Sequence, residues 1–248
     1  MLIAIHQLHY LPWLRYMHKL ASADVFIVLD NIQFNKNGFQ NRNSIKTPQG
    51  RLVLTVPVLH QFAQNLDQVL IDGKQAWQRK HWGSIQNSYR KAPFFCEHEP
   101  FLSEVYAKRK WEKLNDLNRF MLDYFLKALG VSVPVLYGSE LTVPGDASER
   151  LVNLCKAASG TAYLTGAFAA GQYLQPELFE RAGISLAVQE FKAPEYPQLF
   201  PEKGFIPELS ILDLLLNCGS HSLDILMGTL GGDCPRSRQG LSPQEQKK

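Results

Sequence analysis

The chain has 248 residues, of which 45% are hydrophobic and 20% are charged, and its formal net charge is +3. This composition is ordinary for a globular protein, and the charge balance lacks the strong basic bias of a dedicated nucleic-acid binder. No apolar run is long enough for a membrane span. The four cysteines lie far apart without a C-x-x-C pair. Reduced thiols in a cytoplasmic protein are therefore expected, in place of a disulfide framework or structural zinc site.

The first thirty residues predict a strand, a short helix and a second strand. Residues 2–5 are apolar and are not preceded by a basic stretch, which favours a first strand over a signal peptide. Apolar residues at helical spacing follow in residues 13–21, and residues 25–29 form the unbroken apolar run of a buried strand. The three elements together predict a βαβ unit with parallel strands and a right-handed crossover.

Three polar side chains follow these two strands, and we predict that they form the centre of a site. His6, Gln7 and Asp30 would emerge at the carboxyl ends of neighbouring parallel strands, where open α/β sheets bind ligands. Histidine can move a proton near neutral pH, so His6 and Asp30 are candidate catalytic residues and Gln7 a substrate-binding residue. The alternatives are a buried histidine bonded to the backbone and a carboxylate that caps a turn. A metal held by His6 and His9 would lack a well-spaced third ligand, so no metal is predicted.

Residues 31–47 are polar and turn-prone, and we expect a loop there before a strand at residues 51–58. Gln33, Arg42 and Lys46 are its candidate substrate-binding residues. Arginine offers a planar fork to phosphate or carboxylate, and lysine offers a point charge. A merely solvated, charged loop is the alternative reading.

Two helices are expected in the middle of the chain. Residues 75–91 place Trp77, His81, Ile85 and Tyr89 on one face. Aromatic residues at this spacing usually belong to a core, but an imidazole on an apolar face needs a partner, and His81 is therefore a third candidate catalytic residue. A long helix is expected from residue 103, where Ser103 can provide the cap, to residue 130.

The second half of the chain alternates predicted helices and strands, as α/β folds do. We expect residues 1–140 to form an N-terminal α/β region that contains the site. Residues 141–230 would form a smaller C-terminal α/β region that shares its core, and residues 231–248 a disordered tail. The predicted fold is a mainly parallel, Rossmann-like sheet with a βαβ opening. Its later elements are a strand at 131–137, a helix capped by Ser148, a strand at 162–165, a small-residue loop at 166–171, a helix at 176–182, a strand at 184–191 and a helix at 210–217.

Tyr196 and Gln198 lie in a proline-rich passage between the last predicted strand and the last helix. A loop braced by prolines could form the rim of a pocket. We therefore expect both residues, together with Tyr10 from the β-to-α connection, to contact the substrate. A purely structural role for the passage is the alternative.

Several motifs in order along the chain resemble the WbqC-like family. They span about residues 3–228 and include Ile5-His6-Gln7, Tyr10-Leu11-Pro12-Trp13, Asp24-Val25-Phe26, Asn41-Arg42-Asn43, Lys80-His81-Trp82, Tyr196-Pro197-Gln198 and Asp213-Leu214-Leu215. The sequence departs from the family pattern at Leu8-His9 and at Arg15. The resemblance implies a bacterial protein of the kind encoded with genes for surface-polysaccharide or amino-sugar biosynthesis.

The resemblance and the polar residues together predict a group transferase of bacterial surface-polysaccharide biosynthesis, of the O-antigen or lipopolysaccharide type. Its substrate would be a nucleotide-linked or phosphate-bearing sugar or other small molecule, and its cofactors and oligomeric state stay open. His6 would handle protons, Gln7 and Asp30 would orient the substrate, and Arg42 and Lys46 would hold its anionic part. The alternative is a non-catalytic binding or scaffold subunit of a sugar-modifying complex.

Overall fold

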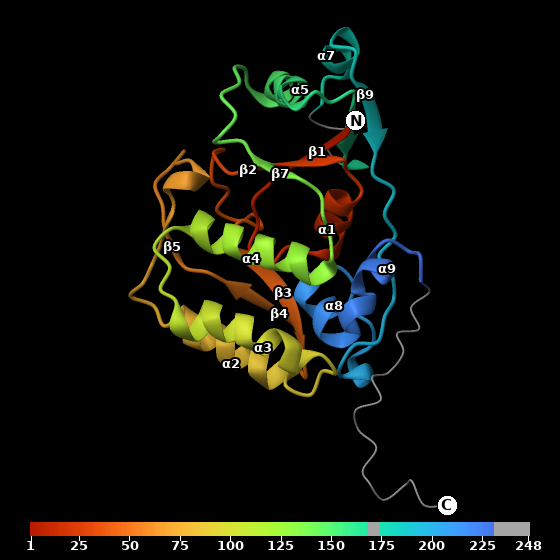
Figure 1. Ribbon diagram of the computed structural model, residues 1–248. Helices are drawn as coiled ribbons and strands as arrows, with labels where there is room; N and C mark the ends of the chain where they lie inside the picture. The colour runs from red at the N-terminus through yellow and green to blue at the C-terminus, as the bar shows by residue number, and fades with distance from the viewer. Residues whose placement is uncertain (168–173, 231–248) are drawn as a thin grey trace, which may run out of the picture.

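The computed structural model of the chain describes residues 1–167 and 174–230. Within this part of the chain, five strands form one parallel sheet in the order β7-β2-β1-β8-β9 (Figure 1). The strands are β1 (Leu2–Gln7), β2 (Val25–Leu29), β7 (Val135–Tyr137), β8 (Ala162–Thr165) and β9 (Ser185–Val188). The predicted βαβ opening and Rossmann-like α/β fold are confirmed. Most of the expected loop at 166–171 and all of the expected tail at 231–248 lie outside the described residues.

The order of the strands reverses at β1, because the chain first moves outward through β2 and β7 and then returns to the other side of β1 for β8 and β9. Figure 1 shows α1 and α4 on one side of the sheet and α5 and α7 on the other. The helices are α1 (Leu14–Ala21), α4 (Leu114–Leu129), α5 (Ala147–Ala157) and α7 (Pro176–Arg181). The boundary between β1 and β8 is therefore a topological switch point, where open α/β sheets bind ligands.

Each face of the sheet buries its own set of apolar side chains. Because side chains alternate along a strand, Ile3 and Ile5 face α5 and α7, where they pack with Leu154 and Phe179. Ala4 belongs to the larger core on the other face, to which α1 and α4 contribute. Full burial of one such aliphatic or aromatic side chain stabilises the fold by about 1.5–3 kcal/mol.

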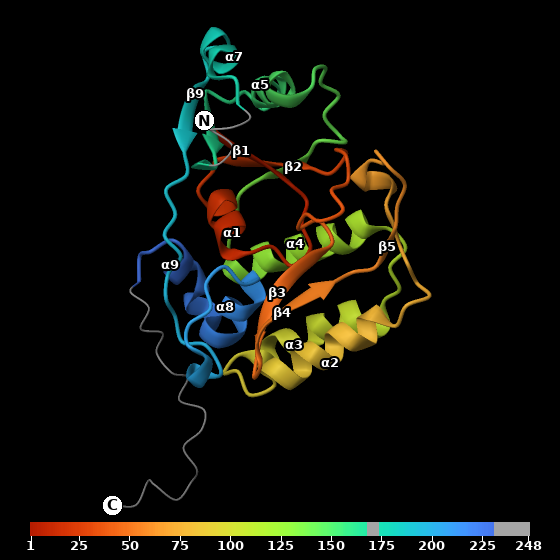
Figure 2. The ribbon, with the colours of Figure 1, turned by 180° about the vertical axis from the view of Figure 1, so that it is seen from behind.

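The residues between β2 and α4, together with residues 211–226, form a second layer beneath α1 and α4. Figure 2 shows the antiparallel hairpin of β3 and β4 near α8 and the α2–α3 pair, and β3 contacts both α2 and α8. No helix in the described ranges is long and apolar enough to cross a bilayer. The elements of this layer are β3 (Arg42–Thr47), β4 (Gly50–Thr55), β5 (Val58–Leu59), β6 (Leu70–Ile71), α2 (Trp77–Tyr89), α3 (Phe95–Ser103), a π-helical turn (Glu104–Lys108), α8 (Ile211–Cys218) and α9 (Ser222–Leu226). Short 3₁₀ turns are Leu66–Gln68, Pro201–Lys203 and Gly219–His221.

The expectation of a loop throughout residues 31–47 was wrong, because residues 42–47 form the strand β3. The strand is polar in sequence yet largely buried, since its side chains have partners inside the protein. Asn43 donates to the carbonyl of Leu11 at 2.5 Å, and the backbone amide of Lys46 donates to the Tyr89 hydroxyl at 2.9 Å. A polar sequence therefore does not exclude a buried strand.

The expected helix over residues 103–130 was also wrong, because an extended segment separates α3 and its π-helical turn from α4. The amide of Ile71 donates to the Glu112 carbonyl at 2.8 Å, and the amide of Leu114 donates to the Val69 carbonyl at 3.1 Å. These bonds draw the segment toward β6, and α4 begins only after it. Ser103 ends α3 instead of beginning a helix.

The helix predicted to begin at Ser148 is α5, which begins one residue earlier, with Asp146 at its N-cap. The hydroxyl oxygen of Ser148 accepts a bond from the Gln175 amide at 3.1 Å, so it links α5 to the start of α7 instead of capping its own helix. The strands β7 and β9 are also shorter than predicted.

Candidate functional site

The strands β1 and β8 separate directly after their last paired residues, Ala4 and Leu164. The carbonyl oxygens of a strand point alternately to its two sides. The carbonyl of Met1 accepts a bond from Ala162, on the side of β8. Ile5 comes four residues after Met1, an even number, so its carbonyl also points toward β8. At this position, the switch point, the pairing of the two strands has stopped.

The side chain of Lys19 fills this position. From α1, its Nζ donates to the Ile5 carbonyl at 2.8 Å and lies 5.6 Å from the centre of the Tyr163 ring. Only 5% of Lys19 is exposed, and no carboxylate of the described residues lies within 4.0 Å of its ammonium. Burial lowers its pKa to about 8. Because buried charges in proteins are normally paired, this ammonium is suited to the anionic group of a ligand.

The imidazole of His6 lies at the same end of β1. Its ring centre is 4.9 Å from that of His9 and 4.9 Å from that of Tyr16. Burial, and then the positive charge of Lys19, lower the pKa of His6 to about 3, so His6 is neutral at pH 7. Its Nδ1 lies 3.4 Å from the carbonyl oxygen of Gln7, which can only accept a hydrogen bond. Nδ1 therefore carries the proton in this contact, and Nε2 is left as a proton acceptor.

Two buried polar atoms beside His6 have no hydrogen-bond partner within the described part of the chain. They are Nδ1 of His9 and the hydroxyl of Tyr16. About nine in ten buried polar groups are paired in native proteins, and an unpaired one costs about 1–3 kcal/mol. The pair therefore indicates a place where a ligand or water completes the bonding.

Aromatic rings form the outer part of this cluster. Trp13 stacks on His9 with ring centres 5.0 Å apart, and Phe39 packs against Trp13 at 4.7 Å while 47% of Phe39 stays exposed. Such rings offer flat apolar surface to a sugar or a base. We define the switch-point site as Lys19, His6, His9 and Tyr16, with Trp13 and Phe39 at its rim.

Gln7 ends β1 next to this site. Its side-chain oxygen accepts a bond from Gln40 at 3.3 Å. The Gln40 backbone carbonyl in turn accepts a bond from Asn118 at 2.8 Å. Gln7 is thus held by the polar connection after β2, at the end of β1 that carries His6.

Asp30 is buried, and three donors occupy its carboxylate. The backbone amide and the hydroxyl of Ser139 donate at 2.8 and 2.7 Å, and the Arg119 guanidinium forms a close ion pair. Arg119 also lies 3.6 Å from the centre of the Tyr137 ring. These contacts fasten the end of β2 to the end of β7, which suits a positioning residue better than a base.

His81 and Tyr10 are brought together, but in a different cluster. Nδ1 of His81 lies 2.9 Å from the Tyr10 hydroxyl, which lies 2.6 Å from the Tyr106 hydroxyl. All three are buried, and burial lowers the pKa of His81 to about 4. Tyr10 and its neighbour His9 have different ring partners, so this network lies beside the switch-point site and not within it.

Lys46, Tyr196 and Gln198 meet in a third cluster, whose centre is the buried Asp213. The Asp213 carboxylate accepts bonds from Tyr89 at 2.7 Å, Tyr196 at 2.8 Å and Gln198 at 2.9 Å. Lys46 donates to the side-chain oxygen of Gln198 at 3.2 Å. Burial raises the pKa of Asp213, although the three hydrogen bonds oppose the shift. These side chains satisfy one another and join β3 to α8.

Arg42 and Gln33 are not placed with any of these clusters. The Arg42 guanidinium donates to the backbone carbonyl of Asn37, at the start of β3. Gln33 is exposed, and its backbone bridges to Asn65. Neither contacts Lys19.

Three residues of the switch-point site were not predicted from the sequence: Lys19, Tyr16 and Phe39. The spacing of Tyr16 and Lys19 was the available signal, because residues three apart lie on one face of a helix. Both lie on α1, the helix that connects β1 to β2, and their contacts place them at the same switch point as His6.

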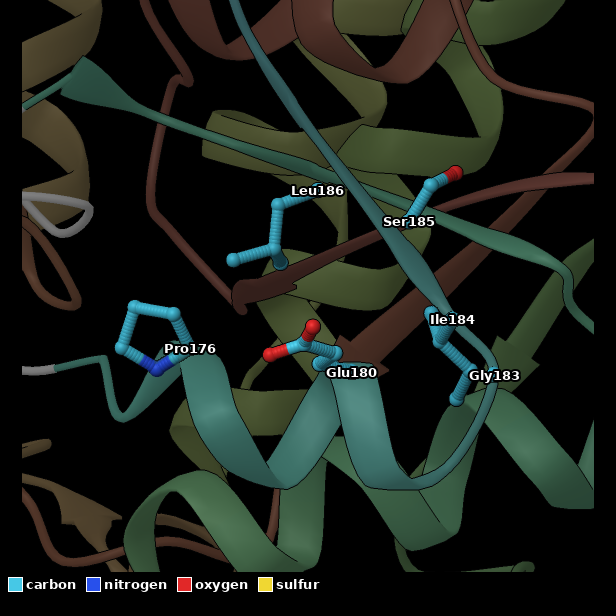
Figure 3. Close-up of a pocket in the computed structure, with 6 residues that line it drawn as sticks. All are labelled: Pro176, Glu180, Gly183, Ile184, Ser185 and Leu186. Atoms are coloured by element: carbon cyan, nitrogen blue, oxygen red, sulfur yellow. The ribbon is translucent and has the colours of Figure 1, made fainter.

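A separate pocket of about 430 Å³ lies at the outer edge of the sheet. Figure 3 shows its lining residues on α7, on β9 and on the loop between them. None of the predicted site residues lines this pocket, and its only charged lining residue is Glu180. Elsewhere in the described ranges, no three His, Cys, Asp or Glu side chains are grouped as metal ligands.

The doubly wound parallel sheet, with polar groups at its switch point, defines a Rossmann-like α/β protein. A model of the WbqC-like protein family matches residues 7–225. A Mycobacterium tuberculosis protein described as uncharacterized protein Rv1507c is 35% identical over 227 residues, which cover 90% of this chain and 96% of that protein. The chain belongs to the WbqC-like protein family. No solved structure matches it.

Proposed function

We propose that the protein is a group transferase whose anionic substrate, nucleotide-linked or phosphate-bearing, binds at the switch point between β1 and β8. The observation that supports this most is the buried ammonium of Lys19, which has no carboxylate partner in the described residues. The neutral imidazole of His6 lies close enough for its pKa to respond to the charge of Lys19. A cation and a proton acceptor thus occur together where this fold class binds ligands.

The chemistry assigned to each group follows from its charge. A hydroxyl or amine of the acceptor attacks the transferred group, and the proton of that nucleophile passes to Nε2 of His6. The bond between the transferred group and its anionic leaving group breaks, and the leaving group keeps the bonding electrons. Lys19 stabilises this negative charge, while His9 and Tyr16 offer hydrogen bonds to the substrate.

The biosynthetic setting that we propose is bacterial surface polysaccharide of the O-antigen or lipopolysaccharide type. Membership of the WbqC-like family supports it, because the family resemblance implies such genes as neighbours. The rim residues Trp13 and Phe39 support it as well, since flat aromatic surfaces suit sugar rings and bases.

A ligand panel tests the proposal. Nucleotides, nucleotide-sugars, sugar phosphates and acyl-CoA are screened by thermal shift against wild type, Lys19→Met and the exposed control Lys127→Met. A ligand at a hundredfold excess over its Kd stabilises by about 2.7 kcal/mol. We expect an anionic hit that Lys127→Met keeps and Lys19→Met loses. Equal stabilisation of Lys19→Met would contradict the proposed site.

One observation favours the scaffold function as a second candidate. On the β5–β6 hairpin Phe62 is 98% exposed, and Leu59 and its cross-strand partner Leu70 are also exposed. Exposed apolar groups of this kind often mark protein contacts. Complementation separates the two functions: each variant is expressed in a deletion strain whose surface glycan depends on this gene, and the glycan is measured. A scaffold would tolerate His6→Ala and fail with Phe62→Ser, and a transferase would show the reverse.

A further inference from the structure

A second pocket, of about 690 Å³, lies where α2 begins, and no residue of the switch-point site lines it. Small-molecule sites typically have volumes of about 300–1,000 Å³. Two kinds of residue in its lining are suited to a ligand: the aromatic residues Trp77, Tyr106 and Trp111, and the cations Arg79 and Lys110.

The aromatic residues are held in fixed positions. Trp111 donates from Nε1 to the Val105 carbonyl at 2.9 Å, and the Tyr106 hydroxyl lies 2.6 Å from that of Tyr10. Trp77 and Tyr106 are buried and meet edge to face, with ring centres 6.2 Å apart. A pre-formed aromatic wall binds a flat ring at a small cost in conformational entropy.

The charges at the pocket favour an anion. Arg79 and Lys110 are both exposed, and no carboxylate in the described ranges lies within 4.0 Å of either cation. Glu112 is the only acidic residue of the lining. An arginine fork together with a lysine point charge is suited to a phosphate group.

The backbone beside the pocket is unusual as well. Tyr106 lies on the π-helical turn Glu104–Lys108, and such turns occur frequently at functional sites. Through Tyr106 and Tyr10, the pocket is also connected to the loop between β1 and α1, which carries His9.

We propose that the pocket at the start of α2 binds a nucleoside monophosphate unit, in which a ribose joins a flat aromatic base to a phosphate. The ring lies against the partly exposed Trp111, and the phosphate pairs with Arg79 and Lys110. This inference is independent of the proposed transferase function, because it uses none of the switch-point residues.

Isothermal titration with adenosine 5′-monophosphate tests this inference, with adenosine and inorganic phosphate as separate arms. We expect the monophosphate to bind more tightly than either fragment. The double variant Arg79→Gln/Lys110→Gln should weaken binding about tenfold or more. The matched control Arg90→Gln/Lys91→Gln changes two exposed cations at the other end of α2 and should leave the Kd within about twofold. Trp111→Leu should weaken the binding of both the monophosphate and adenosine.

Three results would overturn the inference. One is the absence of saturable binding to wild type at up to about 10 mM monophosphate. Another is equal affinity of wild type and Arg79→Gln/Lys110→Gln. The third is loss of binding with Lys19→Met instead, which would place the nucleotide at the switch point. Because the cations replaced in the two double variants are exposed, a circular dichroism melt should show both double variants folded.

Discussion

The ammonium of Lys19 donates a hydrogen bond to the backbone carbonyl of Ile5 at 2.8 Å, at the point where β1 separates from β8. In a continuous sheet that carbonyl would accept from a strand amide. Here the switch point leaves it for a side chain, and the ammonium that fills the position is buried without a carboxylate in the described residues. The sheet topology thus creates the position that the charged ammonium of Lys19 occupies, and the proposed site depends on this charge.

The first prediction concerns the pH dependence of stability that Lys19 causes. Burial lowers its pKa from 10.5 to about 8, so the unfolded chain binds the proton more tightly than the folded chain. The buried charge therefore destabilises the folded state. This destabilisation is complete below pH 8 and is relieved as the pH rises toward 10.5. The free energy of unfolding of wild type, relative to Lys19→Met, should rise by on the order of 3 kcal/mol across this window. Urea unfolding at pH 7.5 and pH 10 measures the difference, and a constant difference would contradict it.

The second prediction concerns His6. Burial and the charge of Lys19 lower its pKa to about 3, so the imidazole should stay neutral throughout pH 5–8. In ¹³Cε1-labelled protein, the resonance that His6→Gln removes should not move across this range, while free histidine in the same tube titrates. His6→Ala should lower turnover by about 10²–10⁴-fold, the usual contribution of a general base. An inflection of the His6 resonance near pH 6.5 would disprove the assigned environment.

The third prediction is that Asp30 has a bracing role, which means that it stabilises the fold by joining the end of β2 to the end of β7. Asp30→Asn would weaken the ion pair with Arg119 and turn an amide donor toward the donors of Ser139. Loss of one partner from such a buried network should cost about 2–4 kcal/mol. The control Glu140→Gln removes only the distant, exposed partner of Arg119 and should cost less than about 0.5 kcal/mol. Chemical denaturation compares the two variants, and a fully stable Asp30→Asn would refute the bracing role.

Lys46 should hold the segment after Tyr196 in place. Its ammonium donates to Gln198 at 3.2 Å and to the Gly204 carbonyl at 2.7 Å. In Lys46→Met both acceptors lose this donor, so amide hydrogen exchange at residues 198–206 should become faster. The global stability should fall by about 1–3 kcal/mol. Lys203→Met, an exposed change in the same segment, serves as the control. Unchanged exchange in Lys46→Met would show that the network does not hold the segment.

The elements that the sequence predicted well are those with strong local patterns. The apolar runs of β1 and β2 and the stripe of α2 follow directly from their periodicity. The strand β3 was missed because its polar residues find partners far away in sequence, such as Gln198, which lies 152 residues from Lys46. The break before α4 was missed for the same reason, since it depends on a bond that the Val69 carbonyl accepts and a bond that the Ile71 amide donates.

The sequence predicted those residues of the candidate site whose position depends on the sheet topology alone. His6 and Gln7 are the last residues of β1, so a βαβ unit places them at the carboxyl edge of the sheet, where folds of this class bind ligands. The remaining predicted residues fall into separate clusters, because their side-chain partners are set by tertiary contacts. Asp213, for example, joins Tyr196 and Tyr89 from different parts of the chain. Lys19 was missed because an isolated helical lysine reads as solvated until the switch point beside it is known.

The most direct test of the switch-point site is the pKa of Lys19 with and without an anion. Its ¹³Cε resonance, assigned by its loss in Lys19→Met, is followed against pH in lysine-labelled protein, alone and with uridine diphosphate. A bound anion stabilises the charged ammonium. We therefore expect the pKa of Lys19 to be about 8 in the protein alone and higher with the nucleotide. A pKa that uridine diphosphate leaves unchanged would contradict anion binding at Lys19.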